Sequence, residues 1–131
     1  MADITSAVRT YLISQTGARI YLDRLPQSAQ LPACTIAKIS ERDAHTISDR
    51  AAFVHTRLNI AIHSLNRLAT EALAEQLRAS GVAALNDTTN GVRIHGCQIE
   101  SGRRNYTIDA RDGSDDHEYV TEFDLMVSYS E

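Results

Sequence analysis

Residues Phe53 to Gly81 read FVHTRLNIAIHSLNRLATEALAEQLRASG and contain two hydrophobic periods in succession. From Val54 to Ile62 the residues alternate between one mostly apolar set and one mostly polar set, which is typical of a half-buried strand. From Leu65 to Leu77 leucine and alanine recur at three and four residues, which predicts a helix with one apolar stripe. A half-buried strand needs a cover and such a helix needs a surface to pack on, so we expect the two to form one unit.

The ends and faces of this helix can also be predicted. Ser64 or Asn66 can cap its start, and Gly81 can adopt the left-handed conformation that ends a helix. The predicted buried stripe consists of Leu65, Leu68, Ala69, Ala72, Leu73 and Leu77. The opposite arc consists of Arg67, Glu71, Ala74, Glu75 and Arg78.

Length and composition indicate a single globular domain that spans residues 1–131. The chain has 131 residues and 43% hydrophobic content, enough for a substantial core. No stretch approaches the ~20 consecutive apolar residues of a membrane span, and no secretory signal is visible. The two cysteines, Cys34 and Cys97, are expected to be reduced core thiols rather than a disulfide framework.

The charge is distributed unevenly along the chain. The net charge is −4, which does not favour non-specific nucleic-acid binding. Residues 109–131 carry eight acidic residues and one basic residue, so the rest of the chain has a net charge of +3. This asymmetry suits head-to-tail association between copies, although a solvated acidic loop would give the same pattern.

Further elements follow from the same periodicities. Asp3 or Thr5 can cap a helix from Asp3 to Gln15, which Thr16-Gly17 ends. The alternation changes phase at Gly96, where we expect a β-bulge, and Tyr106 to Ile108 can extend a strand. The other predicted strands are Arg19–Leu22, Ala33–Ile39, Val92–Glu100 and Tyr119–Tyr129.

The predicted fold class is α+β, with one mixed, mostly antiparallel sheet of four to five strands and two helices packed on one face. The strand–helix–strand unit from Val54 to Glu100 could instead give one parallel pair with a right-handed crossover. Ser40–Ala51 is interpreted as a long hairpin connection, and Gly102–Glu118 as a second long polar segment. Loops of this length in a compact domain are often functional.

No pattern in the chain indicates an enzyme, a cofactor or a metal site. His55 and His63 lie about 26 Å apart on one strand face, too far to share a metal. His95-Gly96-Cys97 suggests a thiol nucleophile with a base, but no third group orients them. Asp109, Asp112, Asp115 and Asp116 are rich in oxygen ligands but lack the EF-hand spacing, so a solvated or partner-facing loop is favoured over a cation site.

The order of elements resembles the tail-terminator, or tail-completion, proteins of long-tailed bacteriophages. The short strand Ile20-Tyr21-Leu22 follows the first helix, and the step Leu31-Pro32-Ala33-Cys34-Thr35-Ile36 is similar to the family's "lP-x-x-x-i". Arg57–Ile62 followed by Ala69–Leu77 resembles its "v-x-v-x-i…a-x-x-l-a-x-x-v-x-x-l" block. His117–Tyr129 resembles its closing strand, with Glu118 where the family usually has an arginine.

The resemblance implies a structural virion protein without catalytic activity. Such a protein forms a hexameric ring that caps the tail tube, ends its polymerisation and offers a surface for joining the head. The implied partners are other copies of the chain, the major tail tube protein and a head-completion or connector protein. No nucleic-acid sequence recognition and no membrane are implied, and the protein would assemble in the host cytoplasm and reside in the virion at the head–tail junction.

The resemblance and the charge pattern together suggest which residues contact partners. The predicted basic contacts are Arg42, Arg50, Arg103 and Arg104. The predicted acidic counterparts are Asp112, Asp115 and Asp116. The alternative hypothesis is a small non-catalytic adaptor or binding domain of a secretion system or another phage-derived system.

Overall fold

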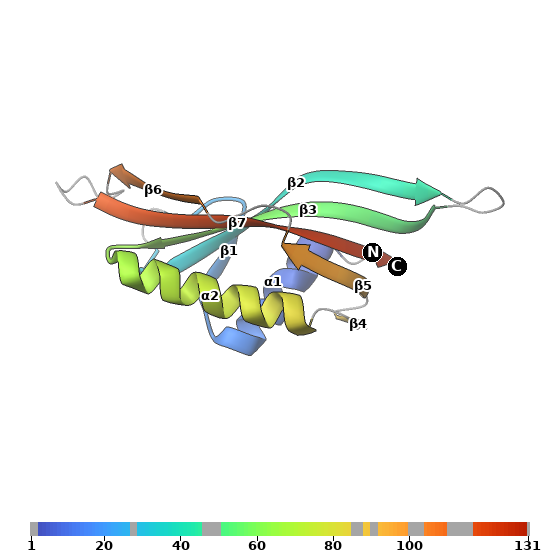
Figure 1. Ribbon diagram of the computed structural model, residues 1–131, viewed down its shortest axis with the longest axis horizontal. Coiled ribbons are helices and arrows are strands. Elements are labelled where there is room, and N and C mark those ends of the chain that lie inside the picture. The colour runs from blue at the N-terminus through green and yellow to red at the C-terminus, as the bar shows by residue number, and fades with distance from the viewer. Residues whose placement is uncertain are drawn as a thin grey trace.

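A computed structural model describes residues 3–26, 29–45, 51–84, 88–89, 92–99, 104–109 and 117–130. The fold is α+β, as predicted, with one sheet and two helices in two layers (Figure 1). The helices are α1 (Ile4–Thr16) and α2 (Arg67–Ala84). The strands are β1 (Ile20–Leu22), β2 (Ala33–His45), β3 (Ala51–Ser64), β4 (Thr88–Thr89), β5 (Val92–Ile99), β6 (Arg104–Asp109) and β7 (His117–Ser130).

The sheet is mixed and mostly antiparallel. Its order is β1-β2-β3-β7-β5-β4, and β6 also pairs with β7. Among the described strands, β1 and β2 form the parallel pair, whereas all other pairs are antiparallel. The alternative parallel pair between the strands that flank α2 was wrong, because β7 lies between β3 and β5. The described sheet has seven strands rather than four or five, because β4 and β6 form strands of their own.

Both helices cover the same face of the sheet, as predicted (Figure 1). The core between the layers is formed by Val8 and Leu12 of α1, Leu77 of α2, and apolar residues of the central strands. Leu58 lies opposite Leu125, and Ile60 opposite Phe123, across β3 and β7. The alternation of β3 therefore directs Leu58 and Ile60 into the core, as its sequence period predicts.

Helix α1 begins and ends as predicted. Asp3 is its N-cap, and Asp3 Oδ2 accepts hydrogen bonds from Ser6 N at 3.1 Å and Ser6 Oγ at 2.9 Å. Gly17 follows the helix with a φ of 71°, and its N–H donates to Ile13 O at 2.8 Å. This left-handed position favours glycine, because any side chain would strain it.

Helix α2 differs from the prediction in its end and in its buried face. Asn66 caps it, with Asn66 Oδ1 accepting from Leu68 N at 2.8 Å. The helix continues through Gly81 to Ala84, so Gly81 does not end it. Thr70, Ala74 and Leu77 are buried, whereas Leu68 is 77% exposed.

The displaced stripe has a geometric cause. A helix turns by about 100° per residue, so Leu68 points almost opposite to Thr70. Because Thr70, Ala74 and Leu77 face the sheet, Leu68 faces away from it, and Leu65 precedes the helix and is 56% exposed. Ala74, predicted on the polar arc, is fully buried, and Ala72, predicted in the buried stripe, is exposed.

The segment Ser40–Ala51 is not merely a connection, because strands β2 and β3 continue into it. Ser40 pairs with Arg57, and the ladder extends to His45 opposite Ala51. The register shifts between Lys38 and Ser40, so Ile39 forms a bulge and is 53% exposed. The two strands reach beyond the helical layer in Figure 1.

The predicted bulge in β5 is confirmed. The register with β7 shifts between Ile94 and Gly96, which leaves His95 as the extra residue of the bulge. The phase change in the sequence therefore marks a real change of strand register.

Candidate assembly surface

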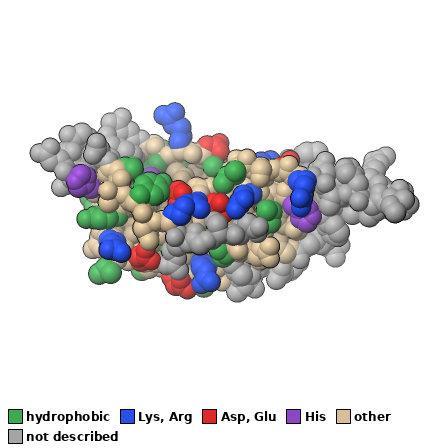
Figure 2. All heavy atoms as spheres, turned by 45° about the horizontal axis from the view of Figure 1, so that its top comes forward, with side chains coloured by type: hydrophobic (Ala, Val, Ile, Leu, Met, Phe, Trp, Pro, Cys, Tyr) green, Lys and Arg blue, Asp and Glu red, His purple; other side chains and the backbone are tan. Residues whose placement is uncertain are grey.

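The outer face is the surface of the sheet opposite the helices. It carries the odd-numbered residues of β3 from His55 to His63 and the even-numbered residues of β7 from Glu118 to Ser128, because the intervening residues point to the core. Basic and acidic side chains lie side by side over the middle of this face (Figure 2). The outer face is therefore the charged surface of the molecule that the described helices leave uncovered.

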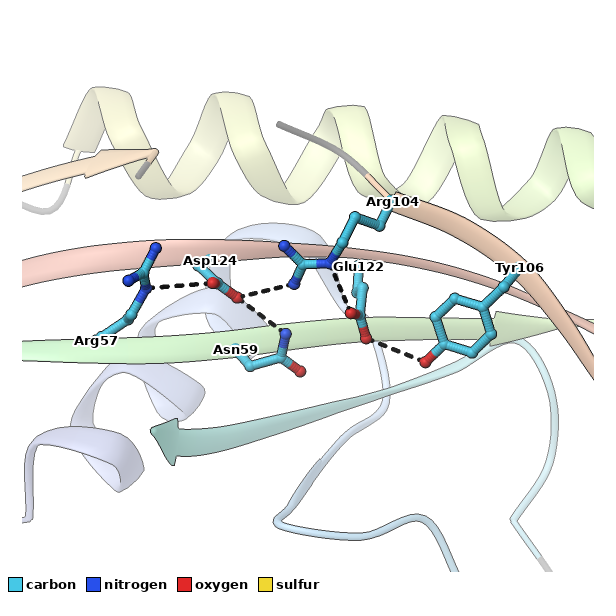
Figure 3. Close-up of polar contacts among 6 residues, drawn as sticks. All are labelled: Arg57, Asn59, Arg104, Tyr106, Glu122 and Asp124. Atoms are coloured by element: carbon cyan, nitrogen blue, oxygen red, sulfur yellow. Dashed lines mark hydrogen bonds and ion pairs between the residues drawn. The ribbon is translucent and has the colours of Figure 1, made fainter. Parts of the chain in front are cut away.

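Asp124 is the centre of a polar network on the outer face (Figure 3). Asp124 Oδ1 accepts a hydrogen bond from Asn59 Nδ2 at 3.0 Å and one from Arg104 Nη2 at 3.3 Å. Asp124 Oδ2 lies 3.2 Å from Arg57 Nε, where the two form an ion pair without the alignment of a hydrogen bond. Three strands, β3, β6 and β7, thus meet at one buried carboxylate.

Glu122 extends the network along β7. Glu122 Oε1 accepts from Arg104 Nε at 2.8 Å, and Glu122 Oε2 accepts from the Tyr106 hydroxyl at 3.0 Å (Figure 3). Two arginines therefore face two carboxylates, and the network is electrically balanced. These side-chain contacts hold the short strand β6 to β7 in addition to the hydrogen bonds of their backbone ladder.

The charges shift the pKa values within this network. Burial raises the pKa of Asp124, but the hydrogen bond from Asn59 and the nearby Arg104 and Arg57 outweigh it, so the pKa lies below its ordinary value. The hydrogen bond to Glu122 is the largest cause of the raised pKa of Arg104. Asp124 and Arg104 are therefore both ionised at neutral pH.

A second polar cluster stiffens the end of the β2–β3 pair. Glu41 Oε1 accepts from the Tyr129 hydroxyl at 2.8 Å and from Thr56 Oγ1 at 3.2 Å. Lys38 Nζ also lies 3.4 Å from this oxygen. The hydrogen bond from Tyr129 is the largest cause of the lowered pKa of Glu41. Glu41 thus joins β2, β3 and β7 through polar contacts.

The predicted contact residues lie at different places on the sheet. Arg42 is exposed on β2, opposite His55 of β3. Arg104 is on β6 and is engaged by Glu122 and Asp124 of its own chain. The other predicted contact residues lie outside the described residues and are Arg50, Arg103, Asp112, Asp115 and Asp116.

Sequence reasoning missed the partners of Arg104. In the sequence, Glu122 and Asp124 share one face of the alternating last strand, and Arg57 and Asn59 share one face of the central strand. The alternation therefore places these residues on one face of each strand, but only the register between the strands brings them together.

The histidines of the outer face have partners within the chain. His55 Nδ1 lies 2.7 Å from Ser128 Oγ, and His63 Nδ1 lies 3.3 Å from Glu118 Oε1. Glu118 is only 2% exposed. Among the described residues, no group of three His, Cys, Asp or Glu side chains could hold a metal ion. The aspartates from 112 to 116 lie outside this part of the chain.

The described cysteines are free, as predicted. Burial raises the pKa of Cys34 and the pKa of Cys97 to about 12 each. A thiol with such a pKa is almost entirely protonated near neutral pH and is a poor nucleophile.

A hollow of about 250 Å³ lies between the first turn of α2 and the strands β6 and β7. Its lining includes Arg67, Thr70, Asn105 and Tyr119, but no described His, Cys, Asp or Glu. It therefore lacks the groups that most often act as general acid or base near neutral pH.

No described helix is long and apolar enough to cross a membrane.

The chain was compared with known proteins. No family model matches the sequence, and no curated protein matches it. The fold is similar to a chain in a solved structure described as the virion of a native gene transfer agent particle. The TM-score is 0.49 at 15% identity, and the match covers 97% of this chain and 95% of that chain. At this level of similarity, the likeness carries no information on function.

Proposed function

We propose that this protein is a structural virion component that caps the phage tail tube as a hexameric ring. The ring ends tube polymerisation and presents the surface to which the head is joined. The partners are other copies of the chain, the major tail tube protein and a head-completion or connector protein. Under this proposal the protein has no catalytic activity and resides in the virion at the head–tail junction.

The observation that carries this proposal is the extension of β2 and β3 beyond the helical layer. The buried apolar residues of β2 are Ala33, Cys34 and Ile36, near the start of the strand. From Ser40 onward the strand remains paired with β3, although its described side chains add no apolar residue to the core. The polar contacts of Glu41 hold this extension to β7. A rigid, paired arm that the core does not require is suited to contacts with other chains.

The surface chemistry agrees with assembly through ionic contacts rather than through a large apolar interface. The network around Asp124 is balanced within the chain, whereas Arg42 is exposed on the extension. A closed ring requires two different surfaces on each subunit, one for each neighbour. An acidic C-terminal part and a more basic remainder provide two such surfaces.

The proposal is tested by mixing the purified chain with tail tubes assembled from the tube protein encoded by the same genome. We expect the chain to sediment with the tubes and to appear as a ring at one tube end in electron micrographs. A matched sample of unpolymerised tube protein controls for binding to free subunits. Absence of binding to tube ends would contradict the proposal and favour the adaptor hypothesis.

A further inference from the structure

A second hollow, of about 300 Å³, opens on the outer face between β5 and β7. It is lined by Gly96, Cys97, Gln98, Met126 and Ser128. The glycine is not required by its surroundings, because a Cβ atom built on Gly96 would meet nothing within 4 Å. Its φ also lies outside the left-handed region that favours glycine. Gly96 carries no side chain at the bulge, so it leaves a gap into which another chain can fit.

The hollow ends a continuous row of residues across four strands. Arg42 of β2 lies opposite His55 of β3, His55 lies opposite Ser128 of β7, and Ser128 lies opposite Gly96 of β5. The hydrogen bond between His55 and Ser128, at 2.7 Å, connects the basic end of the row to the hollow. We call these four residues the Arg42 row.

In the described part of the outer face, the Arg42 row and the row next to it contain basic but no acidic side chains. The adjacent row contains Ser40, Arg57, Met126 and Gln98, so neither row contains a carboxylate. Arg42 is exposed and has no hydrogen bond or ion pair with another described side chain. The nearest carboxylate on β7 is Asp124, which Arg57, Arg104 and Asn59 already engage. An acidic partner would therefore find an unneutralised arginine at one end of the row and an open hollow at the other.

The same chain contains an acidic segment that matches this surface, but that segment cannot reach its own Arg42 row. Residues 109–116 contain four aspartates and one arginine. The segment joins β6 to β7 and is attached at Asp109 and His117, which are paired with each other. Ser128 lies eleven residues further along β7, about 36 Å away. The seven residues between Asp109 and His117 are attached at both ends and extend no more than ~14 Å from them. Contact between the acidic segment and the Arg42 row therefore requires a second copy of the chain.

We propose that the Arg42 row is the docking site for the acidic segment of a second copy of this chain. Each subunit then presents the row at one end of the sheet and the acidic segment at the other. Such a head-to-tail contact is heterologous, and a heterologous contact forms a ring when the rotation between successive copies closes. The inference rests on the proposed ring and identifies the surface that closes it.

Charge exchange between subunits tests this docking directly. The first variant is Arg42→Glu, and the second replaces Asp112, Asp115 and Asp116 with lysine. Each variant alone should associate at least about tenfold more weakly than the wild type in sedimentation equilibrium at low salt. Mixing them should restore association, because each reversed surface then meets a complementary one and the two chains alternate around the ring. Arg24→Glu, at an exposed arginine before β2, is the matched control and should associate like the wild type.

A steric variant tests the hollow without changing charge. Gly96→Val should unfold at the same or a higher denaturant concentration than the wild type, because a Cβ atom at this position meets nothing within 4 Å and valine suits a strand better than glycine. It should nevertheless associate at least about tenfold more weakly. Gly96→Ala should have a smaller effect of the same sign.

The outcomes separate this docking proposal from the proposed function. Wild-type association by Arg42→Glu and Gly96→Val, failure of the mixture to restore association, or a wild-type chain that is monomeric at every concentration would overturn the docking proposal. If the wild type caps tubes while these variants cap them equally well, the function stands and the docking surface is wrong. If the mixture restores association but no chain binds tubes, the docking stands and the proposed function is wrong.

Discussion

Arg104 lies opposite Glu122 in the register between β6 and β7, and its Nη2 also reaches Oδ1 of Asp124, two residues further along β7, at 3.3 Å. Arg104 is the first residue of β6, so its side chain reaches past the start of this strand. Its contact with Asp124 connects β6 to Arg57 and Asn59 of β3, with which β6 forms no ladder. One arginine thus connects an edge strand to the centre of the sheet through polar contacts.

We expect Arg104→Ala to lower the free energy of unfolding by about 1 kcal/mol, because the arginine is partly exposed and Asp124 retains two other partners. Amide hydrogens of β6 should exchange faster, whereas those of β3 should change little. Arg104→Lys keeps the charge but not the two-pronged geometry, and it should fall between the wild type and the alanine variant. Unchanged exchange in β6 would show that the backbone ladder alone holds this strand.

Asp124 should make the stability of the protein depend on acid pH. Its folded-state pKa is below the ordinary value of 3.8, so its contribution is complete above that value and is lost as the pH falls through the folded pKa. Urea denaturation at several acid pH values should show a decline that Asp124→Asn reduces. The pKa of Glu41 is also lowered, so Glu41 contributes to the same loss of stability at acid pH. Glu41→Gln should remove this contribution. Identical pH profiles for wild type and Asp124→Asn would contradict the assignment.

The two leucines of α2 should respond oppositely to truncation. Leu77→Ala should lower the free energy of unfolding by about 2–5 kcal/mol, because Leu77 is fully buried in the core. Leu68→Ala should change it by no more than about 0.5 kcal/mol, because Leu68 is 77% exposed. Thermal denaturation of the pair measures the difference. A large loss for Leu68→Ala would mean that the helix packs with the stripe that the sequence pattern favours.

The cysteines should be unreactive in the folded protein. With pKa values raised to about 12 by burial, Cys34 and Cys97 should react with a thiol reagent at about pH 8 far more slowly than in urea-unfolded protein. The reaction is followed spectroscopically with and without urea, and Cys97→Ala assigns the signal of each thiol. Rapid labelling of native Cys97 would revive the hypothesis of a thiol nucleophile.

The local pattern of the chain was sufficient to predict much of the fold. Asp3 and Gly17 mark the ends of α1, the alternation of β3 identifies its core face, and Gly96 marks the bulge in β5. These features depend on residues close in sequence, whose backbone preferences are expressed locally. The rotation of α2 could not be predicted in the same way, because two overlapping apolar arcs are available and the packing against the sheet selects one.

The candidate surface was less predictable, because it depends on register. The sequence suggested Arg42 as a contact residue, but its alignment with Gly96 depends on the register of four strands. Ser40–Ala51 was interpreted as a connection because it is polar and charged. The structure shows that a strand pair can continue beyond the core when ladder hydrogen bonds and the contacts of Glu41 stabilise it.

The central claim is that this chain ends tail-tube growth, and the length distribution of tubes tests it most directly. Tube protein is polymerised with and without the chain, and the tubes are measured in electron micrographs. We predict that the chain stops elongation and leaves capped tubes that no longer grow when fresh tube protein is added. Tubes that elongate equally in its presence and continue to grow from both ends would contradict the account.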